Sequence, residues 1–146
     1  MKVLKMTVGL PRSGKSTWAK QQNIPIVNPD SIRLALHGQR FLPEAEQMVW
    51  AMAKYMVKSL FLAGHDVVIL DATNITKSRR DEWKSKDWVR CFIEIDASTE
   101  ECLERAIDDI DIQPIIKKMS FEYQKPHDSE LTEKEYNFLY AADSKV

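Results

Sequence analysis

The stretch "GLPRSGKST" at residues 9–17 has the residue types and spacing of a loop that binds phosphate. Gly9 and Gly14 bracket four residues, and Lys15 and Ser16 follow at once, which is the G-x-x-x-x-G-K-[ST] pattern. Glycines accept positive φ, so backbone N–H groups can turn toward phosphate oxygens, and the following helix adds the positive end of its dipole. We expect Lys15 on the β- and γ-phosphates of ATP and the Ser16 hydroxyl on Mg²⁺. The competing interpretation is a plain glycine turn that leads into an amphipathic helix.

Two carboxylates stand where apolar runs end. Asp71 follows the apolar residues 67–70, as a Walker B acid does, and could orient a water on Mg²⁺ or hold the acceptor of the phosphoryl group. A strand-end Asp that only caps a turn is the alternative. Asp30 could accept the proton of an incoming hydroxyl, because phosphoryl transfer uses one carboxylate in that role. It could equally be the N-cap of a helix that begins with Ser31, and the sequence leaves both interpretations open.

Segments with strand and helix patterns alternate along the chain and must position these residues. The predicted strands cover residues 2–8, 24–28, 66–71 and 88–95. The predicted helices cover residues 15–22, a segment in two pieces that ends with 44–62, then 76–86, 98–107, 112–124 and 132–142, the last with a capping box of Thr132 and Glu135. This alternation predicts an α/β fold with a parallel sheet of four or five strands and helices on both faces. Ligands bind at the carboxyl ends of such strands, so residues 9–17, 28–30 and 71–74 are expected to meet there.

The composition and charge of the chain limit its class. At 146 residues it is expected to form one domain over residues 1–146. A formal net charge of −1 gives no overall attraction to nucleic acid or to an anionic membrane, although residues 1–20 carry five basic side chains and no acid and residues 96–111 carry seven acids against Arg105 alone. No apolar stretch approaches the ~20 residues that span a bilayer, and the start lacks the apolar core of a signal peptide. We therefore expect a cytoplasmic protein with no membrane partner.

Some soft side chains are expected in the core. Met48, Met52 and Met56 recur at helical spacing and are predicted to fill the core rather than to touch a cofactor. Cys91 and Cys102 lie in apolar runs and are predicted to be small core residues rather than parts of a disulfide or metal site.

Four segments taken together resemble one enzyme family. "GLPRSGKSTWAK", "VNPDSIR", "VVILDATNITKSRR" and "ECLERAI" match, in this order over residues 2–126, the P-loop kinase domain of the bacteriophage polynucleotide kinase family and the small phage kinases related to it. Enzymes of that family move the γ-phosphate of ATP to the 5′-hydroxyl of DNA or RNA. The resemblance implies a P-loop kinase fold, ATP and Mg²⁺ as cofactors, a nucleic acid or nucleotide as acceptor and, for a phage-encoded protein, the host cytoplasm.

The resemblance also implies roles for individual residues. It places Lys15 and Ser16 on the nucleotide phosphates and Mg²⁺, with Asp30 as the general base. Arg33 would hold the 3′-phosphate of the acceptor, and Arg105 would stabilise the transferring phosphoryl group. Asp30 and Arg33 are three residues apart, hence on one helical face, and a guanidinium can grip a phosphate with two parallel hydrogen bonds. A solvated helix residue is the alternative for Arg33.

The predicted site has several groups of residues. The catalytic residues are Asp30, Lys15 and Arg105. The ATP-binding residues are Gly9, Arg12, Ser13, Gly14, Lys15, Ser16 and Thr17. The substrate-binding residues are Arg33, Asp71, Thr73, Asn74 and Arg79, and the metal ligands are Ser16 and Asp71. For Arg79 and its neighbour Arg80, a charged helix surface is the alternative that needs no ligand.

Two positions depart from the family pattern. After Arg105, the lid segment 106–113 is short and acidic where the family carries a further arginine or basic cluster, which argues against strong charge compensation by this segment and against a long nucleic-acid acceptor. Arg12 stands where the family has Gly or another small residue, and its side chain either points away from the phosphates or supplies part of the missing charge. This sequence holds no Asp-x-Asp-Gly-Thr stretch of the phage enzyme's phosphatase domain, so the kinase unit alone is expected.

The leading hypothesis is an ATP-dependent phosphotransferase that acts on a nucleic acid or nucleotide, either at a 5′-hydroxyl or at the hydroxymethyl group of a modified DNA base. One alternative is a small-molecule kinase of the same fold, acting on a nucleoside, sugar or antibiotic. Another is a regulator that binds ATP and transfers nothing, against which an intact Asp30 beside an intact P-loop argues. The small net charge leaves polymer and small-molecule acceptors unresolved.

Overall fold

A computed structural model of the chain describes residues 1–38, 41–127 and 129–140. Its centre is a four-stranded sheet made of β1 (Val3–Val8), β2 (Ile26–Val27), β3 (Val67–Leu70) and β4 (Val89–Glu94). The strands pair in the order β2-β3-β1-β4, and every pairing is parallel. The predicted parallel sheet is therefore confirmed. A fifth position beside β4 is limited to a single bridge between Phe92 and Thr132.

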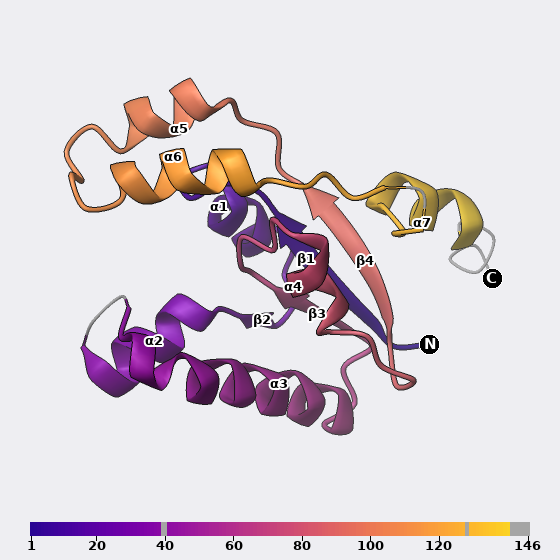
Figure 1. The fold of residues 1–146 in the computed structure, drawn as a ribbon. Helices are drawn as coiled ribbons and strands as arrows, with labels where there is room; N and C mark the ends of the chain where they lie inside the picture. Colours follow the sequence, from indigo (N-terminus) through magenta and orange to yellow (C-terminus); the bar gives the residue numbers. More distant parts are fainter. Residues whose placement is uncertain (39–40, 128, 141–146) are drawn as a thin grey trace.

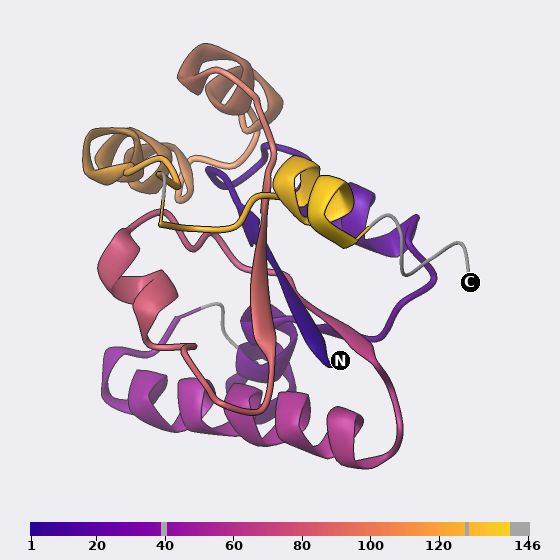
Figure 2. The same cartoon turned by 90° about the vertical axis from the view of Figure 1, so that its right-hand side faces the viewer.

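Helices cover both faces of this sheet (Figures 1 and 2). Their bounds are α1 (Lys15–Lys20), α2 (Pro29–His37), the 3₁₀ turn η1 (Pro43–Ala45), α3 (Glu46–Leu62), α4 (Lys77–Asp81), α5 (Thr99–Arg105), α6 (Gln113–Glu122) and α7 (Glu133–Tyr140). α3 and α4 lie on one face, and α1 and α7 lie on the other (Figure 2). α5 and α6 lie side by side above the carboxyl end of β1 and share a small core (Figure 1). Among the described residues, no helix has the length and apolar character needed to cross a membrane.

The main core lies between the sheet and the row Val49, Ala53, Val57 and Phe61 of α3. The prediction that the three methionines fill the core is wrong for Met48 and Met56, which are 46% and 40% exposed, whereas Met52 is partly buried and packs against the main core. Two neighbouring rows of α3 are apolar, and the row of smaller side chains lets the helix approach the sheet more closely. Cys91 and Cys102 are buried and free, as predicted.

Two predicted elements are shorter in the structure, and one is capped as expected. The helix expected over 76–86 ends at Asp81, where the chain continues in turns: the Trp83 N–H donates to the carbonyl of Arg80 at 3.2 Å and the Lys84 N–H to that of Asp81 at 3.1 Å. The strand expected over 24–28 is only Ile26–Val27, and Pro25 before it has no N–H to donate. The capping box before α7 is confirmed by the hydrogen bonds between Thr132 and Glu135. Residues 141–142 of that predicted helix lie outside the described residues.

Candidate active site

The loop between β1 and α1 has the backbone that the sequence predicts. Gly14 has φ 109°, and Arg12 adds a second positive φ of 67°. A Cβ atom on Gly9 would lie 2.7 Å from Ser13 Oγ and 3.2 Å from the carbonyl oxygen of Ile95, so a larger residue does not fit there. The Gly9 N–H donates to the carbonyl of Thr73 at 3.0 Å, which joins the loop to the segment after β3.

Lys15 lies inside this loop. Its ammonium donates to the carbonyl of Leu10 at 2.6 Å and reaches Ser13 Oγ at 3.4 Å. The residue is only 9% exposed, and this burial lowers the pKa of Lys15 to about 8, against the opposing negative charges of Asp71 and Asp30. The ammonium therefore lies on a loop carbonyl, and the negative charges of both predicted carboxylates, Asp71 and Asp30, act on it.

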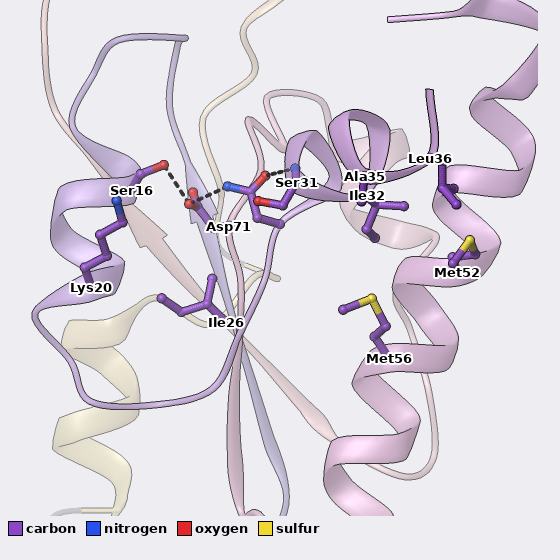
Figure 3. A pocket seen from close by; sticks show the side chains of 11 residues that line it. Ser16, Lys20, Ile26, Ser31, Ile32, Ala35, Leu36, Met52, Met56 and Asp71 are labelled. Carbon is purple, nitrogen blue, oxygen red and sulfur yellow. Dashed lines mark hydrogen bonds between the residues drawn. The ribbon is translucent and has the colours of Figure 1, made fainter. Parts of the chain in front are cut away.

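Asp71, at the end of β3, is hydrogen-bonded to residues that follow β1 and β2. Its Oδ2 atom accepts the Ser16 hydroxyl at 2.8 Å and the Asn28 side-chain amide at 3.1 Å (Figure 3). Asp71 is 4% exposed, and its partners come from the P-loop and the end of β2 rather than from its own turn, so the structure does not favour the turn-capping alternative. Hydroxyl and carboxylate oxygens are the ligands that Mg²⁺ prefers, so Ser16 and Asp71 fit that ion. Within the described chain no group of three or more His, Cys, Asp or Glu could hold a metal, so nucleotide phosphates would have to complete its coordination.

Asp30 does not cap α2. The cap is Asn28, whose Oδ1 atom accepts the backbone N–H groups of Asp30 at 2.8 Å and Ser31 at 3.3 Å. The capping interpretation of Asp30 is therefore wrong, because Pro29 is the first helical residue and Asp30 already lies inside the helix. Its side chain is 71% exposed and accepts Nη1 of Arg33 at 2.7 Å.

Arg33 has a second and stronger partner in Glu46, at the start of α3. Nε and Nη2 of Arg33 donate to the two carboxylate oxygens of Glu46 at 2.8 and 2.6 Å, a bidentate arrangement. Burial lowers the pKa of Arg33, but the hydrogen bonds to Glu46 and Asp30 outweigh burial and raise the pKa. The side chain of Arg33 is 13% exposed, so the alternative of a solvated helix residue is wrong. Glu46 could not be predicted from the sequence, since the pair joins two helices across a loop.

Arg79 of α4 contacts the same aromatic ring as Arg33, that of Trp50 on α3. Its guanidinium carbon lies 4.5 Å from the ring centroid of Trp50, and that of Arg33 lies 5.9 Å from the same centroid. Arg79 also pairs with Glu82 at 3.1 Å. Trp50 was not predicted as a site residue, because an aromatic residue on a largely apolar helix looks like core.

Arg80, next to Arg79, is fully buried, so a charged helix surface is the wrong interpretation for it. Nε and Nη2 donate to the carboxylate of Glu130 at 2.6 and 3.0 Å, and Nη1 donates to the carbonyl of Asn74 at 2.8 Å. Burial alone raises the pKa of Glu130, but the hydrogen bond and charge of Arg80 outweigh burial and lower the pKa. Arg80 thus fixes the segment after β3 through its hydrogen bond to the carbonyl of Asn74.

Arg105 and Arg12 connect the P-loop to the α5–α6 pair. Nη1 of Arg105 donates to the carbonyls of Arg12 and Ser13 at 3.0 and 3.1 Å, and half of its side chain is exposed. Nη2 of Arg12 lies 2.9 Å from Oδ2 of Asp109 in the acidic segment. The Arg12 side chain therefore pairs with the lid segment. This favours the alternative in which it points away from the phosphates. Arg105 lies at the loop, and its contact with the transferring group stays a prediction.

Thr73, Asn74 and Thr17 have different surroundings. Asn74 is 1% exposed and its amide donates to the carbonyl of Thr7 at 2.9 Å, so it holds the segment after β3 against β1. Thr73 contributes its carbonyl to Gly9, and Thr17 is exposed at the start of α1. Their contacts with substrate or ATP stay predictions.

A pocket of about 510 Å³ opens beside Asp71, between α1, α2 and α3 (Figure 3). Its polar end is formed by Ser16, Asn28 and Asp71. Its other walls are largely apolar and are lined by Ile26, Ile32, Ala35, Leu36, Met52 and Met56. Asp30 and Arg33 do not line it, so the pocket and the predicted base lie on different sides of α2.

Residues 4–108, well over half of the chain, match the AAA domain family. The chain belongs to the AAA domain family. The matched part of this AAA domain runs from β1 through α5 and contains the P-loop, Asp30, Asp71 and Arg105.

Solved structures resemble this AAA domain. A chain of the Pnkp1/Rnl/Hen1 complex matches with a TM-score of 0.64 and 29% identity, over 71% of this chain and 38% of that one. A gluconokinase from Sinorhizobium meliloti 1021 matches with a TM-score of 0.55 and 16% identity, over 90% of this chain and 79% of that one. A sugar kinase from Janibacter sp. HTCC2649 matches with a TM-score of 0.63 and 13% identity, over 90% and 83%. The fold is therefore that of P-loop kinases, as predicted.

Proposed function

We propose that this protein is a kinase that transfers the γ-phosphate of ATP to the 5′-hydroxyl of a nucleic acid. The observation that carries the proposal is the position of Asp30. Its carboxylate is 71% exposed, does not cap α2, and is held by Arg33 at 2.7 Å on the segment that follows β2. A carboxylate that caps no helix, is open to solvent and is held in one orientation at the carboxyl end of a parallel sheet can meet an incoming hydroxyl and accept its proton.

The nucleotide half of the site would be built from the P-loop. The ammonium of Lys15 would exchange the carbonyl of Leu10, now at 2.6 Å, for oxygens of the β- and γ-phosphates. Ser16 and Asp71, joined at 2.8 Å, would hold Mg²⁺, which when bound neutralises charge on the phosphates. Arg105, anchored on the loop carbonyls at 3.0 and 3.1 Å, would turn its exposed edge to the transferring group.

The acceptor half would be built from α2. The incoming 5′-hydroxyl would give its proton to Asp30 while its oxygen bonds to the γ-phosphorus and the bond to the β-phosphate oxygen breaks, leaving ADP. Arg33 would meet the adjacent 3′-phosphate of the acceptor with the remaining N–H groups of Nη1 and Nη2, because Asp30 holds one N–H of Nη1 and Glu46 holds Nε and one N–H of Nη2. Such a transfer relies mainly on positioning and charge balance, which these contacts supply.

The resemblance of four sequence segments to the polynucleotide kinase family supports a polynucleotide acceptor. The Pnkp1/Rnl/Hen1 chain shares 29% identity with this one, whereas the gluconokinase and the sugar kinase share 16% and 13%. A second candidate is a small-molecule kinase, and the observation that favours it is the 510 Å³ pocket beside Ser16 and Asp71. Pockets of that size and apolar lining hold small ligands, although Asp30 does not line this one.

The direct test is to incubate the protein with γ-labelled ATP, Mg²⁺ and a panel of acceptors. The panel contains 5′-hydroxyl DNA and RNA oligonucleotides, duplex DNA with hydroxymethylated bases, nucleosides, and sugars including gluconate. We expect label at the 5′ ends of the oligonucleotides. Label on a sugar or nucleoside alone would move the function to the second candidate, and label on no acceptor would contradict a kinase. The Lys15→Met variant, which should be inactive, controls for contaminating kinases.

A further inference from the structure

Trp50 on α3 is a meeting point for two arginines from two other helices. Arg33 of α2 and Arg79 of α4 place their guanidinium carbons 5.9 and 4.5 Å from its ring centroid. The ring itself packs edge-on against Trp83, with centroids 6.4 Å apart, so its position is fixed by the core. A cation stacked on an aromatic face keeps its N–H groups in a set plane. Trp50 therefore contacts both guanidiniums and connects α2 and α4 through one ring.

The two arginines differ in how firmly they are paired. Arg33 is locked to Glu46 by two hydrogen bonds between side chains that are 13% and 20% exposed. In the described part of the chain, the only carboxylate paired with Arg79 is Glu82, at 3.1 Å, and these side chains are 39% and 50% exposed. Exposed ion pairs three residues apart on a helix contribute little. A dianionic or diester phosphate would therefore compete well for Arg79.

These residues form a series of contacts that begins at the proposed base. Asp30 contacts Arg33, Arg33 lies over Trp50, and Trp50 carries Arg79. The pocket described above is lined by Met52 and Met56 on another face of α3, so the pocket does not separate these contacts. An extended strand that gives its 5′-hydroxyl to Asp30 and its first phosphate to Arg33 would bring its next phosphate to Arg79.

We propose that Arg79, held on the ring of Trp50, binds the second phosphate of a single-stranded nucleic-acid acceptor. This inference rests on the proposed function and adds to it a preference for acceptors of two or more linked nucleotides over a single nucleotide. The chemistry of the site fits a phosphodiester, because a guanidinium presents paired N–H groups to two phosphate oxygens. Binding of the phosphate at this site should not depend on the identity of the base, since both arginines contact phosphates and not bases.

The test compares two acceptors that differ by one nucleotide, a nucleoside 3′-monophosphate and a dinucleotide 3′-phosphate. For Arg79→Ala, we expect kcat/KM for the dinucleotide to fall roughly 10- to 100-fold, the scale of one lost contact to a charged group, while kcat/KM for the mononucleotide stays within about twofold. The KM for ATP should not change. Arg79→Lys keeps the charge without the planar fork and should recover part of the loss.

Lys84→Ala is the matched control, because it also removes one positive charge close to α4, at a side chain that is 62% exposed and pairs with Asp81 at 3.7 Å. It should behave as wild type on both acceptors. Equal losses on both acceptors for Arg79→Ala, with a lowered melting temperature, would show that Arg79 only packs α4 against α3. No loss on either acceptor would also overturn the subsite.

A binding measurement separates failure of the subsite from failure of the proposed function. If wild-type protein phosphorylates neither acceptor, the proposed function is wrong. Fluorescence anisotropy of a labelled 5′-hydroxyl oligonucleotide, without Mg²⁺ or ATP, then decides the subsite. A weaker affinity for Arg79→Ala than for wild type and Lys84→Ala supports a phosphate site at Trp50, and equal affinities contradict it.

Discussion

The side-chain oxygen of Asn28 accepts the backbone N–H of Asp30 at 2.8 Å, so the residue that caps α2 stands two positions before the residue proposed to act as base. The amide nitrogen of the same Asn28 donates to Asp71 at 3.1 Å. One small side chain thereby fixes the start of α2 relative to the end of β3. The structural task at this turn belongs to Asn28, which leaves the carboxylate of Asp30 for chemistry.

Replacement of Asn28 tests this division. Asn28→Ala should lower the free energy of unfolding by about 1–2 kcal/mol, because it removes a helix cap and a hydrogen bond to a buried carboxylate. Asn28→Ser keeps a capping oxygen and should recover part of this loss. Urea unfolding of both variants measures the effect, and wild-type stability for Asn28→Ala would show that the cap contributes nothing.

The lowered pKa of Lys15 makes ATP binding depend on pH. Burial places the pKa at about 8 in the free protein, and phosphate oxygens favour the charged form, so bound ATP raises this pKa. Below pH 8 the ammonium is already charged. Above it, binding must take up a proton, so the Kd for ATP should rise as pH increases from 8 toward 10.

Titration calorimetry across this range checks the effect, with Lys15→Arg as the control. A guanidinium stays charged throughout, so its ATP affinity, even if weaker, should not show this rise. A Kd for the wild-type protein that stays constant between pH 7 and pH 10 would contradict a role for the Lys15 ammonium on the phosphates.

Arg33 and Glu46 test the acceptor side. Arg33→Ala should lower kcat/KM for a 3′-phosphorylated acceptor by roughly tenfold to a few hundredfold, the cost of a charge-assisted contact of about 1.5–3 kcal/mol. Glu46→Gln leaves Arg33 in place but loosens its bidentate hold, and should cause a smaller loss in the same direction. Steady-state kinetics with both substrates measures this, and losses of equal size for ATP and acceptor would place Arg33 elsewhere.

The parts of the site that could be predicted are those specified by neighbouring residues. The P-loop was predictable because Gly9, Gly14 and Lys15 determine the local backbone and its charge in one short segment. Asp71 was predictable because an apolar strand precedes it. The parallel sheet followed from the alternation of strands and helices.

The parts that could not be predicted depend on residues far apart in the sequence. Arg79 and Arg80 are adjacent and chemically alike, yet Arg80 is buried because Glu130, 50 residues later, meets it. Glu46 and Trp50 became site residues only when α3 packed beside α2 and α4. Met48 and Met56 of α3 were misassigned because two adjacent apolar rows compete for the sheet, and spacing alone does not choose between them.

The most direct test of the central claim is single-turnover transfer by Asp30→Asn. Asparagine preserves the shape of the side chain and leaves the helix cap formed by Asn28 unchanged. Only an exposed ion pair with Arg33 is lost, so the free energy of unfolding should change by less than about 1 kcal/mol. The amide cannot take a proton from the hydroxyl, so the rate of transfer to a 5′-hydroxyl oligonucleotide should fall roughly 10²- to 10⁴-fold with ATP affinity kept. Near-normal transfer by Asp30→Asn would contradict the account, and Asp71 would be the next candidate for the base.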